Sequence, residues 1–447
     1  MAFAAVAILT TLVIGIPMTL AVDRDARSGA LIGLSYLYGC GAVWAVLFTL
    51  SLLHVRWTAM TTTVTLVAFS AVMWIVVLLR RAEAAPPGAA VDRGPLAMLA
   101  PIADLATVYA VVTFAMYATI TRVWEWDFWA IWGLKGRVFL EAGGIDWRFL
   151  QSPFNDFAHP DYPLLLPLNY AYVAVTNGQW DHRWMALPGI VFGVALILIV
   201  RSLAARELPR FLAALLAFAT AGVALSQYVG LADAPLIAYG TAAILFIRRG
   251  ILFDEASGFR HGAILLGLAA GTKNEGLALI ASVVIAMLIA RASKWRDVLR
   301  LWPAVVIPLP WIVARFAFHL QTDIARGSFI SRAIERIGDS GVIVASLLRW
   351  LPDPWLWLLM LVGMVMIPRT TRTAERFILA AVAIQAVWYL AAYFGTPLDV
   401  IWHIETSWPR VARHLEAPLL FVVMLTLAQA FERGETLAHA EARPELS

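Results

Sequence analysis

Long apolar runs separated by short polar loops dominate the chain. Most runs hold about 20 residues, the length of helix needed to cross a hydrocarbon core roughly 30 Å thick. Such a run can satisfy its backbone polar groups in lipid only as a helix. The pattern therefore predicts an all-α, polytopic membrane protein with about 13 transmembrane helices, at residues 3–22, 30–53, 59–79, 98–120, 184–203, 210–228, 234–247, 262–272, 277–291, 300–320, 341–368, 376–396 and 411–431.

Two apolar runs need separate interpretation. The first, from Phe3 to Val22, has no basic residues before it and is long enough to span, so we interpret it as a transmembrane helix and not as a cleaved signal. The run from Tyr162 to Thr176 is short and contains Pro163 and Pro167, which a spanning helix tolerates poorly. We interpret it as a juxtamembrane or re-entrant helix.

Basic residues in the short loops predict the orientation of the chain. They gather at positions 201–210, 248–260, 291–300 and 369–376, and loops rich in Lys and Arg face the cytoplasm. These loops alternate correctly only if the run at 162–176 does not cross. The loops and polar positions expected on the opposite, outer face are then 122–183, Asp233, Lys273–Glu275, 321–340 and 397–410.

The composition narrows the class further. Hydrophobic residues make up 61% of the chain and charged residues 14%, and the net charge is +4. The basic excess lies mostly in short loops, so it indicates topology and contact with lipid headgroups and does not indicate nucleic-acid binding. Cys40 is the only cysteine, which excludes disulfides within the chain and any cysteine-based metal site.

The chain divides into five parts by this pattern. Three leading helices occupy 1–79, and a cytoplasmic linker rich in Pro, Gly and Ala follows at 80–97. A central module with the large outer loop 122–183 covers 98–320. C-terminal transmembrane helices occupy 321–431, and 432–447 is a charged cytoplasmic tail that we expect to be disordered.

The most polar segment lies within that outer loop, at 122–161. It contains six carboxylates, four cations and one histidine among many tryptophans. Asp127 and Lys135 are eight positions apart, about 12 Å along a helix, so they would bracket a ligand instead of pairing. Asp127 is equally placed to cap the helix that follows it, and Glu125 is either its partner or merely solvated. Tryptophans at such a position usually anchor the chain at the membrane surface.

Further polar residues interrupt the apolar pattern later in the chain. An ionised carboxylate between two apolar spans, as at Asp233, requires a partner or a cavity, and polar residues within a broken helix indicate a functional site. The Lys273–Glu275 triplet is such a break or, alternatively, a simple turn. Arginines before the last helix could bind lipid headgroups or a substrate phosphate. The other candidate site residues are His159, Asp161, Glu275, His403 and Arg410.

The order of these features resembles the GT-C superfamily of membrane glycosyltransferases, in particular the branch with lipid A aminoarabinose transferases and protein O-mannosyltransferases. The matching stretches are WEWDFWAIWGLKGR, HPDYPLLLPL, GLADAPL and GTKNEGL, with WHIETSWPR as a looser match. The resemblance covers roughly 98–320. Two features differ from the family pattern, because three helices precede the polar loop and no soluble C-terminal domain follows.

The resemblance implies transfer of a sugar from a polyprenyl-phosphate donor to a hydroxyl of a lipid, glycan or protein acceptor at the outer face of the inner membrane. Such a reaction needs a carboxylate to accept the acceptor proton and cations to stabilise the leaving phosphate. Asp127 is the candidate base, Lys135, Lys273 and Arg410 are the candidates for phosphate, and His159, Asp161 and Asp233 for sugar or acceptor.

Two alternatives accompany this hypothesis. The first is a divalent cation held by Asp127 and Asp161, an alternative that we do not favour. No other cofactor is indicated. The rival class is a transporter or flippase of a lipid-linked or amphipathic solute, because broken helices and intramembrane charges also occur in transporters. The sequence contains no internal repeat of the kind common in transporters, and its polar clusters gather at one face.

Overall fold

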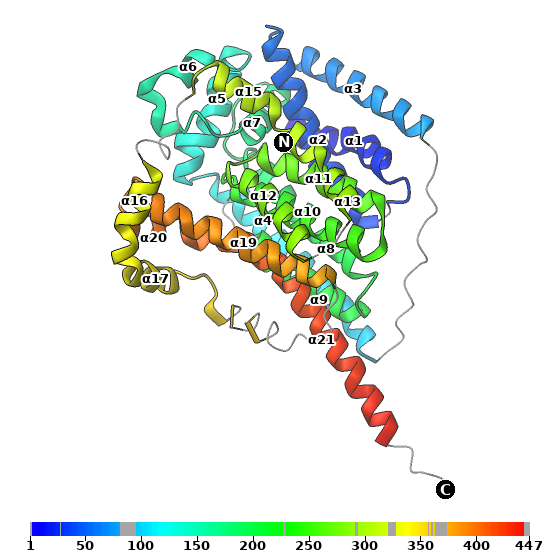
Figure 1. Ribbon diagram of the computed structural model, residues 1–447. Helices are drawn as coiled ribbons and strands as arrows, with labels where there is room; N and C mark the ends of the chain where they lie inside the picture. Colours follow the sequence, from blue (N-terminus) through cyan, green and yellow to red (C-terminus); the bar gives the residue numbers. More distant parts are fainter. Residues whose placement is uncertain are drawn as a thin grey trace.

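The computed structural model of the protein describes residues 2–26, 28–80, 95–226, 229–290, 294–320, 328–355, 357–358, 361–362 and 373–441. These residues form helices and no strand (Figure 1). The long helices are α1 (Ala2–Val22), α2 (Ser28–Leu52), α3 (Ala59–Leu79), α4 (Ala100–Thr121), α8 (Ala186–Ala204), α10 (Asp233–Phe253), α19 (Thr373–Gly395) and α21 (Arg413–Glu441).

Shorter helices fill the space between these. The polar segment after α4 contains one turn of π-helix, η2 (Phe128–Trp132), then α5 (Gly133–Ala142), α6 (Trp147–Gln151), η3 (Pro153–Ala158) and α7 (Leu165–Asn177). The remaining ones are η1 (Pro95–Leu99), α9 (Arg210–Ala224), α11 (Ala256–Ala270), α12 (Glu275–Ile289), α13 (Trp295–Leu299), α14 (Trp302–Val306), α15 (Leu309–Ala317), α16 (Phe329–Glu335), η4 (Arg336–Asp339), α17 (Ser340–Arg349) and α20 (Val400–Val411).

The helix lengths confirm a polytopic membrane protein but not thirteen spans. Among the described residues, eight helical stretches are long and apolar enough to cross a membrane, or nine if α13–α14 and α15, bent by 47°, form one span. Three predicted spans instead form α9, α11 and α12, which have 15 residues each and are about 22 Å long.

The predicted span at 341–368 is not continuous in the structure. Its first part is α17, which ends at Arg349, and the chain then reaches Leu351 before Pro352. A residue that precedes proline is disfavoured in the α conformation, and Asp353 next adopts a left-handed φ of 42°. Residues 356, 359–360 and 363–368 of this stretch lie outside the described residues, as do residues 81–94 of the linker.

The structure of the C-terminal tail also differs from the prediction. Helix α21 extends to Glu441, so residues 432–441 are helical where disorder was expected; 442–447 lie outside the described residues.

Helix α10 forms the centre of the bundle. Every residue from Asp233 to Gly250 is buried, and α8, α11, α19 and α21 pack around it (Figure 1). Its first turn carries Asp233 and tolerates Pro235, because the first N–H groups of a helix have no intrahelical partner and attract negative charge. A carboxylate is thereby fixed at one end of the most buried helix.

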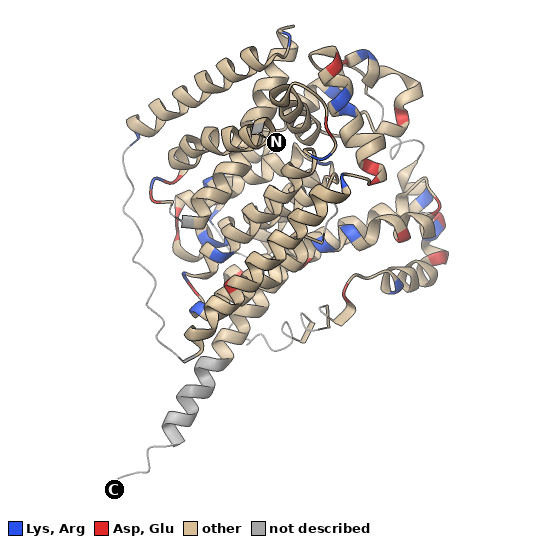
Figure 2. Cartoon of the chain, turned by 180° about the vertical axis from the view of Figure 1, so that it is seen from behind, with Lys and Arg blue, Asp and Glu red and all other residues tan. Residues whose placement is uncertain are grey.

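Along the long helices the charged residues lie near the ends, and the others lie in short helices and loops (Figure 2). At the arginine-rich end, the guanidinium of Arg248 in α10 contacts Glu207 at 2.6 and 2.8 Å and Glu375 at 2.5 Å, all largely buried. These contacts join α10, the α8–α9 loop and the start of α19. The opposite end of the bundle, where α4 and α11 finish and α10 and α12 begin, carries the polar segment 122–161 and Lys273–Glu275.

Helix α7 has the form predicted for a non-crossing segment. Its 13 residues, about 20 Å, are too few to span a membrane alone, and residues 165–175 are buried. Its Pro167 is in the first turn, where proline fits, and Gly178 ends the helix with a φ of 77°.

We therefore expect both flanks of α7 to lie on one side of the membrane. In a Cys40→Ala background, Phe154→Cys and Gln179→Cys, both exposed, should react equally with an impermeant thiol reagent added to intact cells. Ala205→Cys, exposed at the arginine-rich end, is the matched control and should react only after the cells are opened. Opposite labelling of positions 154 and 179 would show that α7 crosses.

Candidate functional site

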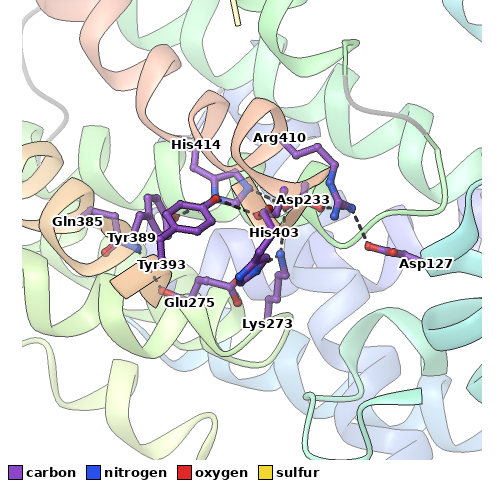
Figure 3. Close-up of polar contacts among 11 residues, drawn as sticks. Asp127, Asp233, Lys273, Glu275, Gln385, Tyr389, Tyr393, His403, Arg410 and His414 are labelled. Atoms are coloured by element: carbon purple, nitrogen blue, oxygen red, sulfur yellow. Dashed lines mark hydrogen bonds and ion pairs between the residues drawn. The ribbon is translucent and has the colours of Figure 1, made fainter. Parts of the chain in front are cut away.

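Asp233 is the centre of the candidate site. Its carboxylate is 1% exposed and lies 3.2 Å from the Lys273 ammonium and 3.0 Å from Nε2 of His414 through Oδ1. Its other oxygen, Oδ2, is 3.6 Å from the Arg410 guanidinium (Figure 3). A buried carboxylate requires such partners, because removal from water strongly disfavours its charge.

Two further carboxylates extend this cluster. Arg410 Nη1 lies 2.6 Å from Oδ2 of Asp127, and Lys273 Nζ lies 2.8 Å from Glu275 (Figure 3). We call Asp127, Asp233, Lys273, Glu275, Arg410 and His414 the Asp233 network. It joins three carboxylates to two cations and a histidine, and its contact between Asp127 and Arg410 connects residues 283 positions apart in the sequence.

The sequence left open whether Asp127 caps the helix that follows it or belongs to a site. Asp127 precedes η2, but its side chain makes no capping hydrogen bond, and it pairs with Arg410 instead. One turn of π-helix follows, a feature that frequently occurs at functional sites. Glu125 lies nearby, where burial raises its pKa, Arg410 opposes the rise and Asp127 adds to it.

His414 was not among the predicted site residues. Its Nε2 bonds to Asp233 and its Nδ1 to the Tyr389 hydroxyl at 2.8 Å, which forms a buried chain from α10 through α21 to α19. The spacing of four between Arg410 and His414 is a signal that could have indicated a shared face. No comparable spacing in the sequence indicated Tyr389 as a site residue.

His403 lies beside the Asp233 network, and its contacts are to Thr396 and Tyr393. Its Nδ1 hydrogen bonds to Thr396 Oγ1 at 2.9 Å, and its ring meets the edge of Tyr393 with centroids 5.1 Å apart. Figure 3 shows the imidazole next to Lys273.

A narrow cavity adjoins the network between α10, α12, α19 and α21. Its polar lining consists of Glu275, Gln385, Tyr389 and His414, and its remaining walls are apolar. The cavity is thus lined by both polar and apolar side chains.

A second cluster of buried polar side chains, built around Lys135 and Asp161, contacts the Lys273–Glu275 triplet through Asn274. Lys135, fully buried, donates to the backbone carbonyl of His159 at 2.6 Å, and its ammonium lies 5.6 Å and 5.9 Å from the ring centres of Trp132 and Tyr162. Asp161, also fully buried, accepts from Asn274 at 2.9 Å. Asn274 is adjacent to Lys273, so the triplet contacts both clusters.

Asp127 and Asp161 have different partners in the structure. Asp127 is paired with Arg410, whereas Asp161 faces Asn274 and, at 3.8 Å, Arg315. Within the described ranges, no group of three or more His, Cys, Asp or Glu residues is arranged to hold a metal ion.

Burial lowers the pKa of Lys135 from 10.5 to about 7, and the charge of Asp161 partly opposes this. The unfolded chain therefore binds more protons than the folded chain between about pH 7 and pH 10, so stability should rise with pH in this window. Below about pH 7, Lys135 is protonated in both the folded and the unfolded chain, so it no longer contributes to the change of stability with pH.

We expect Lys135→Met to remove this part of the pH dependence, which for one proton reaches roughly 1.4 kcal/mol per pH unit. Unfolding of the detergent-solubilised protein at pH 7 and pH 9 measures it. Lys294→Met, at an exposed position, should keep the wild-type slope. Equal slopes in wild type and Lys135→Met would mean that Lys135 keeps an ordinary pKa.

The all-helical bundle, its candidate spans and its buried ion network define a polytopic membrane protein with a polar site at one end of the helical core. No protein-family model, no curated protein and no solved structure matches this chain.

Proposed function

We propose that this protein is a membrane glycosyltransferase that moves a sugar from a polyprenyl-phosphate donor to a hydroxyl of a lipid, glycan or protein acceptor. The observation that carries the proposal is the contact between Asp127 and Arg410 at 2.6 Å, beside Asp233 and Lys273. It brings a partly exposed carboxylate and two cations together, which are the groups that sugar transfer from a phosphate requires.

In the proposed reaction, the donor phosphate binds Arg410 and Lys273. Phosphate competes with Asp127 for the guanidinium of Arg410, since arginine binds phosphate and carboxylate with the same planar donors. Asp127 is then free to accept the proton of the acceptor hydroxyl as the oxygen attacks the anomeric carbon. The bond to phosphate breaks, and the two cations stabilise the charge left on the phosphate.

Asp233 holds both cations in place in this scheme, because it contacts Lys273 and Arg410 together. Lys135 lies beneath the turn at His159–Asp161 and supports its backbone through the carbonyl of His159. Asp161 and the side chain of His159 are then the candidate contacts for sugar or acceptor.

The proposed location is the inner membrane, with the site at the outer face. The support is the concentration of arginines at the opposite end of the bundle, which the positive-inside rule assigns to the cytoplasm.

A transporter or flippase for an amphipathic solute is the second candidate. The bent pair α13–α14 and α15 and the buried charges at Asp233 and Lys273 favour it, since both features occur in transporters.

One experiment tests both candidates. Purified protein in nanodiscs is incubated with polyprenyl-phosphate hexoses, pentoses and amino sugars, together with a lipid extract, and the products are identified by mass spectrometry. Release of free polyprenyl phosphate with a glycosylated product supports transfer. Intact donors, combined with movement of a labelled polyprenyl-phosphate sugar across proteoliposomes, would favour the transporter.

A further inference from the structure

The segment Phe329–Arg349, formed by α16, η4 and α17, is attached to the end of a candidate membrane span. Arg332 Nε donates to the carbonyl of Gly395 at 2.8 Å, and Arg336 donates to the carbonyls of Thr396 at 2.5 Å and Leu398 at 3.0 Å. Gly395 is the last residue of α19, and Figure 1 shows α16 lying across this end. The arginines therefore fix the segment, which we call the arm, where α19 finishes.

The side of the arm turned away from these contacts is apolar and exposed. Ile330, Ile334 and Ile337 are spaced by four and three, so they form one stripe, and their side chains are 70%, 62% and 63% exposed. In α17, Val344 and Leu348 are likewise exposed and four apart. Such an apolar stripe is unfavourable in water.

The remaining side of α17 packs inward on the helix that carries Arg410. Ile343 and Leu347 are buried, and Trp408 Nε1 in α20 donates to the carbonyl of Leu347 at 2.9 Å. The arm thus has one face on α19 and α20 and one face outside the protein. Its position relative to α20 is fixed by packing.

We propose that the arm lies in the interfacial region of the bilayer, with the isoleucine stripe in lipid. Two observations favour lipid as the occupant. Helix α19 is a candidate span that ends at the arm, so the arm is at the level where the chain leaves the hydrocarbon. Val387, Trp388 and Leu390, which lie five to eight positions before the end of α19 at Gly395, are exposed and apolar as well, so this end of the candidate span also presents an apolar outer surface.

Under this proposal residues 340–349, where the predicted span at 341–368 begins, lie in the interface instead. An amphipathic helix with polar and apolar faces lies in the interface plane, whereas a spanning helix is apolar on all sides unless it is packed in protein. Residues 340–349 have this pattern, because Ser346 and Arg349 lie on the side of α17 opposite Val344 and Leu348. The inference holds whether or not the protein transfers sugars.

Spin labels at neighbouring positions test the arm. In a Cys40→Ala background, Ile334→Cys and Glu335→Cys are labelled with a nitroxide, and the protein is reconstituted into vesicles of phosphatidylethanolamine and phosphatidylglycerol. Power saturation is measured with oxygen, which concentrates in lipid, and with a water-soluble nickel chelate. Val387→Cys on α19 is the lipid-facing control.

The label at position 334 should collide with oxygen several times more than with the nickel chelate, as at position 387, and the label at 335 should show the reverse. Equal nickel access at 334 and 335 would place the arm in water and overturn the proposal. Shielding of 334 from both reagents would show that protein covers the stripe and would also overturn it. Ile330→Cys replaces Ile334→Cys if the latter does not fold.

Discussion

Replacement of Asp127 by Asn is expected to slow sugar transfer by about a hundredfold or more, because general acid–base catalysis contributes effects of this size. The free energy of unfolding should change by no more than about 1 kcal/mol. Asp127 and Arg410 are 27% and 24% exposed, and ion pairs reached by water contribute little to stability. Turnover with a polyprenyl-phosphate sugar and chemical unfolding of the same preparation measure the two effects.

The substitution should act on kcat more than on the KM for the donor. Asn at position 127 no longer competes as a charge for Arg410, so the guanidinium is at least as available to phosphate as in the wild type. Glu125→Gln, two positions away on the same loop, is the matched control and should keep most of the activity. Transfer by Asp127→Asn within a few-fold of wild type would rule out Asp127 as the base.

Replacement of Lys273 by Met is expected to lower the free energy of unfolding by about 3 kcal/mol, because the buried carboxylate of Asp233 loses its nearer cation and keeps only Arg410 and His414. Lys273 is 8% exposed and contacts both Asp233 and Glu275. Asp233 is the more deeply buried of the two and should account for most of the loss. Transfer should also be lost, since the proposed phosphate site loses a cation.

A double variant separates the two effects of Lys273. Lys273→Met combined with Asp233→Asn removes both charges and should recover most of the stability without recovering transfer. Lys294→Met controls for the change of residue type at an exposed site. If the double variant is as unstable as Lys273→Met alone, packing of the lysine stem and not its charge stabilises the site.

The apolar runs alone were sufficient to predict an all-helical membrane protein, because the length of a helix and the polarity of its residues are local properties. The same reasoning marked Asp233 and Lys273 as unusual, since a charge between apolar runs requires a partner wherever it lies. It also predicted that α7 does not cross, a prediction with which its length of 13 residues agrees. Helix length was less predictable. α9, α11 and α12 stop at 15 residues, and α17 stops before a proline.

The pairings at the site were decided by the tertiary structure. Nothing local in the sequence relates Asp127 to Arg410, which is 283 positions later, because helices from distant parts of the chain meet only through packing. The same holds for His414, which bonds to Asp233 across 181 positions. Burial of Lys135 under the His159 turn likewise depends on how α5 and the loop fold together. Sequence determined which residues are polar in an apolar chain, and tertiary packing decided which of them meet, since a charge excluded from water is stable only where the fold brings it a partner.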